Sequence, residues 1–220
     1  MIGSELLGVW RVVQWHASIP QPTVEMTGVD LPTSLSELLG SLDAELQVVL
    51  RAKFNTSTVT LLFTDIEEST NRAEQFGDVV WGETVQRHFD ELHRVADAQG
   101  GIVVKTMGDG AMLAFESARE AARAAVDIQR SAGRQLAAGP FTVRVGVHTG
   151  DALHTDGDYF GQTVNKTARI AAAAEGGQVL ASEVVYGLVD QTPGLAFGDP
   201  IALQLRGIPG THLAYPLLGE

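Results

Sequence analysis

The chain has 220 residues, of which 45% are hydrophobic, so it is long enough for one globular domain and an appendage. It contains no cysteine, which excludes disulfides, thiolate zinc sites and a cysteine nucleophile. The formal net charge of −12 disfavours contact with a nucleic-acid backbone. The start has no signal-peptide pattern and no apolar run reaches the roughly 20 residues that span a bilayer, so we expect a cytoplasmic protein without membrane contact.

Residues 1–56 are expected to form an N-terminal appendage to a main domain over residues 57–220. Ser34 and Glu37 form a capping box, and the leucines that follow have helical spacing. The appendage is predicted to contain two possible strands and a helix, over residues 6–15, 23–31 and 35–53. The helix is either a plain packing helix or one that forms a dimer or transmits a signal into the main domain.

The main domain alternates strand and helix patterns. Its first strand, over residues 58–64, is apolar at nearly every position, which is typical of a central strand. The long helix that follows has a buried stripe at Val85, Phe89, Leu92 and Ala96. The later elements are predicted in this order: a hairpin (102–106 and 111–115), a helix (from 117 to about 137), a strand (141–148) ended by residues 149–151, a polar loop (155–158), a helix (164–174), a strand (178–181), a helix (182–189) and two or three weak strands (195–217).

The order of these elements predicts the fold class. Strand, helix, strand, strand, helix, strand is the order of an α+β fold with a ferredoxin-like split βαβ (βαββαβ) core. The elements after residue 164 are then a C-terminal αβ extension.

Two aspartates stand where strands end. Asp65 closes the apolar run of the first strand, and Asp109 lies in the glycine-flanked turn of the hairpin. Each alone is more simply explained as a helix-capping or turn residue. Together, at adjacent strand ends, they could hold two divalent cations about 3.5 to 4 Å apart, as metal-dependent phosphoryl chemistry requires.

Other polar residues allow a nucleotide site without one of the common fingerprints. The backbone of residues 66–70, just before a helix, could cradle phosphate oxygens, although a simple capped helix start has the same pattern. Asn165 and Arg169 share one helical face and could orient a sugar and neutralise a phosphate. Taken alone, both residues, and Arg206, are more simply explained as solvated surface residues. The sequence has no P-loop or dinucleotide fingerprint, and its histidines lack metal-binding spacing.

Four motifs in the correct order resemble the catalytic domain of the class III nucleotide cyclases, over roughly residues 57–217. They are Phe63-Thr64-Asp65-Ile66-Glu67, Val104-Lys105-Thr106-Met107-Gly108-Asp109-Gly110, Val145-Gly146-Val147-His148-Thr149-Gly150 and Asp158-Tyr159-Phe160-Gly161-Gln162-Thr163-Val164-Asn165. The resemblance implies an adenylate cyclase, which converts ATP to 3′,5′-cyclic AMP and pyrophosphate.

The resemblance also implies a role for each matching residue. Two divalent metal ions, Mg²⁺ or Mn²⁺, would be bound at Asp65, Ile66 and Asp109. Lys105 and Asp158 would read the adenine ring, where guanylate cyclases typically carry Glu and Cys. The remaining residues would bind phosphate through the loop (Glu67, Ser69, Thr70), position the ribose and stabilise the transition state (Asn165, Arg169) and contact the terminal phosphates (Arg206).

The family arrangement is a dimer with composite sites. One protomer would supply the metal-binding aspartates and the phosphate loop, and its twin would supply the base-reading and transition-state residues. Lys105 and Asp109 share one short hairpin yet have roles at opposite ends of the nucleotide, and two copies of the chain resolve this conflict. Because one chain carries every functional position, we expect a symmetric homodimer.

One position departs from the family pattern, which usually has Gly where this chain has Glu68. A carboxylate there adds negative charge beside a polyanion unless it turns outward. This favours an alternative function, a catalytically weak nucleotide-binding domain that regulates through dimerisation. A cyclic-dinucleotide synthase also has a split βαβ core, but its Gly-Gly-Asp/Glu-Glu-Phe signature is absent from the sequence.

Overall fold

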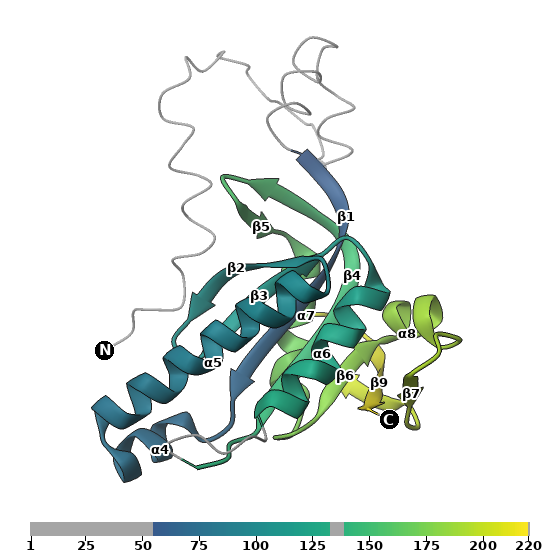
Figure 1. Cartoon of the computed structure of the whole chain (residues 1–220). Coiled ribbons are helices and arrows are strands. Elements are labelled where there is room, and N and C mark those ends of the chain that lie inside the picture. The colour runs from purple at the N-terminus through teal and green to yellow at the C-terminus, as the bar shows by residue number, and fades with distance from the viewer. Residues whose placement is uncertain (1–54, 133–138, 220) are drawn as a thin grey trace, which may run out of the picture. The chain divides into compact units, whose positions relative to one another are not determined.

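The computed structural model describes residues 55–132 and 139–219 (Figure 1). The predicted N-terminal strands, the helix over residues 35–53 and the end of the helix predicted to reach about residue 137 lie outside the described residues. None of the helices in the described part of the chain is both long and apolar enough to cross a membrane.

A mixed sheet organises the domain, and the first strand lies in its interior, as predicted. The sheet has the order β2-β3-β1-β4-β6-β9-β7, with β5 paired to β4 and β8 paired to β9. The strands are β1 (Asn55–Ile66), β2 (Gly101–Met107), β3 (Gly110–Phe115), β4 (Val143–Thr155), β5 (Asp158–Phe160), β6 (Val179–Ser182), β7 (Leu195–Phe197), β8 (Ile201–Gln204) and β9 (Thr211–Gly219). The segment β2-β3-β1-β4 is the ferredoxin-like core, which confirms the predicted fold class.

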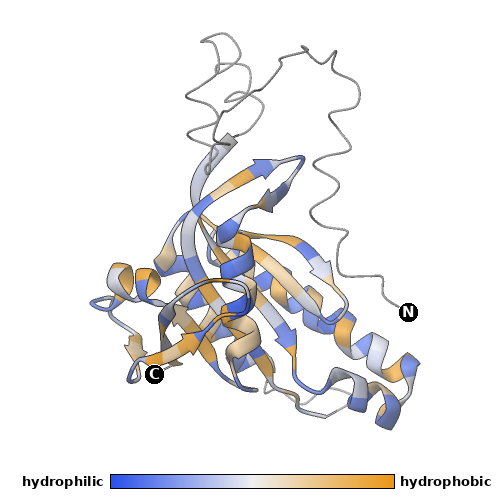
Figure 2. Ribbon diagram, turned by 180° about the vertical axis from the view of Figure 1, so that it is seen from behind, coloured by the Kyte–Doolittle hydropathy of each residue, from blue (hydrophilic) through white to orange (hydrophobic). Residues whose placement is uncertain are grey.

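Helices cover both faces of the sheet. On one face lie α5 (Asp78–Ala98) and α6 (Ala118–Ala132), which pack over the main hydrophobic core (Figure 1). On the other face lies α7 (Gln162–Ala173), and Figure 2 shows the molecule from that side. Because successive strand residues point to opposite faces, Leu62 contacts the α5–α6 side while Phe63 packs with Ala171 of α7.

Two short helices complete the described chain. The first, α4 (Ser69–Phe76), begins directly after β1, so the loop predicted after Asp65 is shorter than expected. The second, α8 (Glu183–Val189), begins after Ser182, whose side chain accepts a hydrogen bond from the Val185 N–H. This is the capping role that serine often has at helix starts.

The structure corrects one predicted element. The strand expected to end at residue 148 continues to Thr155, because β4 pairs with β1 along its whole length and Gly150 lies opposite Val59. The chain then reverses at Asp156 and Gly157, which both have positive φ, so the polar loop predicted over residues 155–158 is a tight turn that leads into β5. Two central residues with positive φ are typical of a tight hairpin turn, a signal that the sequence pattern Asp-Gly contained.

Candidate functional site

The fold brings the two predicted acids to the same end of adjacent strands. Asp65 lies near the end of β1, and Asp109 lies in the turn between β2 and β3. Their strands pair directly, since Thr64 lies opposite Ala111. A Cβ added to Gly110 would lie 2.5 Å from the Thr64 carbonyl oxygen, so glycine allows the turn to approach β1 this closely.

Arg144 joins these acids, and the sequence analysis missed it. It lies on β4 directly opposite Asp65, and its guanidinium forms a close ion pair with the Asp65 carboxylate. Only the strand register places this arginine beside the aspartate. The guanidinium therefore offsets the negative charge of Asp65 in the folded chain.

Unpaired buried polar atoms gather around these residues. Among the described residues, six buried side-chain atoms have no hydrogen-bond partner, and each such atom costs roughly 1 to 3 kcal/mol. Five of them lie on β1, α4, α5, the β2–β3 turn and the start of β4, and the sixth, Thr155 Oγ1, lies in the β4–β5 hairpin. The five are Thr64 Oγ1, Arg72 Nε, His88 Nε2, Asp109 Oδ2 and Arg144 Nε. Such a concentration is expected where bound ligands complete the pairing.

The residues at this end fit a divalent cation that also contacts substrate. Within the described residues no group of three or more His, Asp or Glu side chains could enclose a metal. The protein can therefore offer Asp65, the partly orphaned carboxylate of Asp109 and backbone oxygen, the last at Ile66, whose side chain is buried. Mg²⁺ commonly takes one or two carboxylates together with substrate phosphates and water, which matches this donor set.

The loop after Asp65 differs in detail from the predicted phosphate cradle. The Glu67 N–H donates to the Thr142 carbonyl, and the Glu67 carboxylate accepts from the Thr142 hydroxyl and the Gly176 N–H. The N–H and the carboxylate of Glu67 are therefore already hydrogen-bonded within the protein. The first hydrogen bond of α4 runs from Arg72 N–H to the Glu68 carbonyl, so the Ser69 and Thr70 amides precede the bonded turns and face the helix N-terminus.

Glu68 occupies a backbone conformation that suits glycine. Its φ and ψ are 56° and 30°, in the left-handed region, and its side chain is exposed and does not cap α4. A non-glycine residue there costs on the order of 1 kcal/mol. The usual glycine of the family pattern thus has a conformational reason in addition to the charge argument.

Lys105 and Asp158 meet on the α7 side of the sheet. Lys105 Nζ lies 2.6 Å from Asp158 Oδ2, and the Tyr159 N–H donates to Asp158 Oδ1 at 2.8 Å. A β-bulge makes this possible, since Val103 pairs with Leu113 but Lys105 pairs with Met112. The extra residue turns Lys105 away from the α5–α6 face and toward α7.

The remaining predicted residues also lie on the α7 side. Asn165 and Arg169 are exposed on α7, whose opposite face is buried through Thr167 and Ile170. Arg206 is exposed in the turn between β8 and β9, next to Leu205, which packs against Ile170. The structure therefore forms two groups, an acidic end with Asp65 and Asp109 and a base-reading corner with Lys105 and Asp158.

Two histidines are buried, His88 on α5 and His148 on β4. Burial lowers the pKa of His88 to about 4, although Glu91 and Asp109 act to raise it. Burial also lowers the pKa of His148 to about 4, helped by the charge of Lys166, and its Nδ1 lies 2.8 Å from Ser182 Oγ. Both imidazoles are therefore neutral at pH 7.

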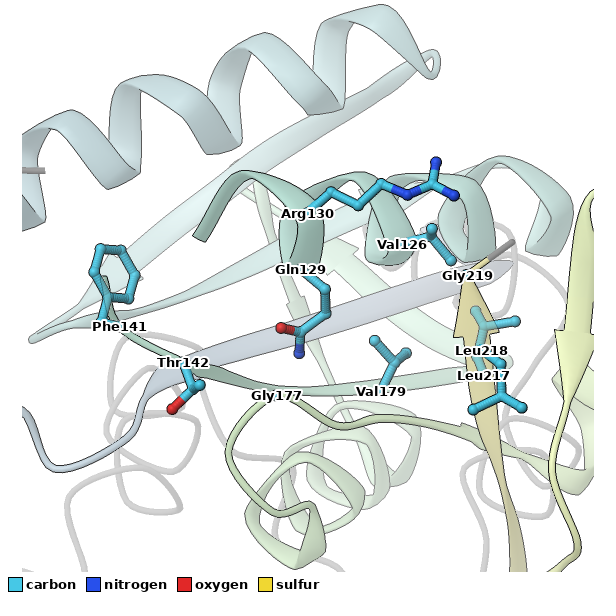
Figure 3. A pocket seen from close by; sticks show the side chains of 10 residues that line it. All are labelled: Val126, Gln129, Arg130, Phe141, Thr142, Gly177, Val179, Leu217, Leu218 and Gly219. Atoms are coloured by element: carbon cyan, nitrogen blue, oxygen red, sulfur yellow. The ribbon is translucent and has the colours of Figure 1, made fainter. Parts of the chain in front are cut away.

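A pocket of about 450 Å³ lies elsewhere, between α6 and the ends of β6 and β9 (Figure 3). Its lining is largely apolar, and Gln129 at its wall donates to the Val143 and Gln178 carbonyls. No predicted site residue lines this pocket. The candidate site is therefore defined by its charged groups, and this pocket is not part of it.

Comparisons with a family model and with curated relatives point to the same protein family. The model of the family described as the adenylate and guanylate cyclase catalytic domain matches residues 52–219. An uncharacterized protein of Mycobacterium tuberculosis is 40% identical over 139 residues, which are 61% of this chain and 46% of that protein. Receptor-type adenylate cyclase B of Leishmania donovani is 30% identical over 197 residues, covering 69% of this chain and 15% of the relative. The chain thus spans less than half the length of these curated relatives.

Solved structures agree. A structure of adenylate cyclases from Trypanosoma brucei in their monomeric state has a TM-score of 0.65 and 27% identity, and covers 73% of this chain and 89% of that one. The guanylate cyclase domain from Catenaria anguillulae in complex with GTP has a TM-score of 0.66 at 21% identity, covers 74% and 96% of the two chains, and shows the fold alone. With the family match over most of its length, the chain belongs to the class III adenylate and guanylate cyclase catalytic domain family.

Proposed function

We propose that this protein is an adenylate cyclase that converts ATP to 3′,5′-cyclic AMP and pyrophosphate. The observation that carries the proposal is the Lys105–Asp158 pair, held by a 2.6 Å contact and by the Tyr159 N–H. Adenine presents an acceptor at N1 and a donor at its 6-amino group, whereas guanine presents a donor at N1 and an acceptor at O6. A lysine facing N1 and an aspartate facing the 6-position therefore match adenine and oppose guanine.

The reaction is an in-line displacement. The ribose 3′-oxygen forms a bond to the α-phosphorus, the bond from the α-phosphorus to the bridging oxygen of the β-phosphate breaks, and pyrophosphate leaves. The 3′-hydroxyl proton passes to water or to a substrate phosphate, since no described side chain at the acidic end is an evident general base. Divalent cations held at Asp65 and Asp109 would lower the pKa of the hydroxyl and neutralise the phosphates.

The arginines supply positive charge where the reaction creates negative charge. Arg169 would contact the pentavalent phosphate of the transition state, and Asn165 would orient the ribose. Arg144 lies beside Asp65, with its Nε buried and unpaired, and would contact the phosphates once a cation neutralises that carboxylate. The Ser69 and Thr70 amides at the start of α4 would receive phosphate oxygens.

A homodimer would complete the site. Lys105 bonds to Asp158 on the α7 side, while Asp109 stays in the turn beside β1, so one chain keeps its base-reading and metal-binding groups apart. Asn165 and Arg169 are exposed and directed away from their own core. Two copies related by a two-fold axis would bring the base-reading corner of one protomer to the acidic end of the other, twice.

One observation favours a second function. Glu68 combines a strained backbone with a negative charge next to the proposed phosphate loop, and the charge would oppose the binding of a nucleotide polyanion. The alternative is a catalytically weak cyclase-like domain that binds nucleotide and regulates through dimerisation.

The test is an assay of the purified full chain with Mn²⁺ and either ATP or GTP, with products identified by chromatography. Cyclic AMP formed from ATP in clear excess over cyclic GTP from GTP supports the proposal. Faster cyclic GTP formation would assign a guanylate cyclase instead. Nucleotide binding without either product would favour the regulatory domain.

A further inference from the structure

His88 has an unusual position for a core residue. It is 2% exposed on α5, its ring meets Phe141 edge to face with centroids 5.2 Å apart, and it lies against Phe89. These contacts would be served equally by an apolar aromatic side chain. Its Nε2, however, is buried and has no hydrogen-bond partner, which is unfavourable unless a partner is supplied.

The course of the chain brings His88 alongside the end of β2. Helix α5 packs against β2 and is joined to it by a tight connection at Gln99 and Gly100. Six residues of strand from Gly101 to Met107 cover about 20 Å, and the ten residues of helix back from Ala98 to His88 cover about 15 Å. His88 therefore lies within about one helical turn of the level at which the turn containing Asp109 begins.

Asp109 carries an acceptor atom that lacks a hydrogen-bond donor. Its Oδ2 is also buried and without a partner, and the charge of this carboxylate acts on His88 against the effect of burial. A neutral imidazole can donate from Nε2, and a carboxylate oxygen accepts. One missing donor and one missing acceptor thus lie on facing elements of the same end of the molecule.

We propose that His88 is a positioning residue for Asp109, whose Oδ2 receives the Nε2–H either directly or through one water molecule. The second carboxylate oxygen, Oδ1, is then directed toward the cation. This inference rests on the proposed metal-binding role of Asp109. A histidine–carboxylate contact behind a metal ligand fixes the orientation of that ligand, and its loss typically weakens metal affinity by 10- to 100-fold.

The experiment measures how much Mn²⁺ tightens nucleotide binding in the absence of turnover. The full chain is titrated with 3′-deoxy-ATP, which lacks the attacking hydroxyl, once in Mn²⁺ and once in EDTA. The ratio of the two dissociation constants isolates the metal-dependent part of binding. We expect His88→Phe to reduce this ratio about tenfold while the constant in EDTA is unchanged.

Two variants separate positioning from packing. His88→Gln keeps an N–H near the place of Nε2 and should recover most of the ratio. His148→Phe replaces the other buried histidine, which has a similarly lowered pKa but lies against Ser182, and should keep the full ratio. Should His88→Phe fail to fold, His88→Leu takes its place as the variant without a donor.

The outcomes distinguish this inference from the proposed function. Asp109→Asn should lose the metal-dependent gain, and its retention would remove the metal role of Asp109 and this inference together. A normal ratio in His88→Phe, with Asp109→Asn impaired, would overturn the role of His88 alone. Equal loss in His88→Phe and His88→Gln, or equal weakening in Mn²⁺ and EDTA, would reduce His88 to a packing residue.

Discussion

The acidic end and the base-reading corner differ in how completely their polar groups are paired. Asp158 in the corner accepts from both Lys105 and the Tyr159 N–H. At the acidic end, Asp109, His88 and Arg144 each keep a buried atom without a partner. One chain therefore holds the proposed base-reading pair in place by itself, whereas the acidic end keeps unpaired atoms that proposed ligands would complete. The Lys105–Asp158 ion pair is partly exposed and contributes less than about 1 kcal/mol to stability. Exchanging it for contacts with adenine would therefore cost little.

Removing an acid tests the unpaired region and should have the largest effect. Asp65→Ala, which removes one of two proposed metal ligands, is expected to lower the rate of cyclic AMP formation by at least about 1,000-fold, a loss of the size seen when electrostatic stabilisation of a transition state is removed. The measurement is the initial rate with saturating Mn²⁺ and ATP. A rate within tenfold of wild type would contradict the role of the acidic end.

Mixing shows whether the two regions work across the dimer. Lys105→Ala homodimers should be nearly inactive as well, yet a heterodimer of Asp65→Ala with Lys105→Ala keeps one intact site. In an equal mixture about half of the dimers are mixed, so about a quarter of wild-type activity should return. Heterodimers proven by mass spectrometry that show no recovery would reject the shared site.

Substitutions in the base-reading corner should change the preference between ATP and GTP. Lys105→Glu, which places an acceptor where adenine N1 needs a donor, is expected to lower kcat/KM for ATP by about 10- to 100-fold. Adding Asp158→Cys should raise kcat/KM for GTP relative to the single variant. Competition assays with both nucleotides give the ratio, and an unchanged preference would show that the corner does not read the base.

The two buried histidines, His88 and His148, make the stability of the folded domain depend on pH. Their folded pKa values of about 4 lie below the usual 6.5, so the unfolded chain binds more protons between these values and stability falls as pH drops through this range. Each histidine should cost on the order of 2 to 3 kcal/mol by pH 4. Urea unfolding at pH 7 and 4.5 should show a smaller loss for His148→Gln, and an equal loss would exclude this histidine as a cause.

Glu68→Gly should have the smallest effect. Glycine relieves the left-handed backbone and removes a negative charge, so we expect tighter ATP binding or a faster rate and up to about 1 kcal/mol of added stability. The matched control is Glu68→Gln, which removes only the charge. Unchanged or poorer kinetics in both variants would remove the concern that Glu68 weakens the site.

The sequence predicted the fold core because its signals are local. Apolar runs, helical spacing and glycine turns set the elements from β1 to β3, and the same signals predict the two aspartates at adjacent strand ends. Arg144 could not be found this way, since only the pairing of β4 with β1 puts it opposite Asp65. His88 was hidden for a related reason, because a histidine on a helix shows its unpaired nitrogen only when the packing around it is known.

The extra residue in β2 sets the side of the sheet on which Lys105 lies, so the proposed choice of nucleotide depends on strand register as well as on residue type. Lys105 reaches Asp158 only because the strand inserts one position between its pairings with Leu113 and Met112. If Val104 paired with Met112 instead, regular alternation would place the lysine on the opposite side of the sheet. Every motif residue with a proposed role would survive in such a chain, yet selection among purines would be lost, so an intact motif alone does not guarantee the activity that it indicates.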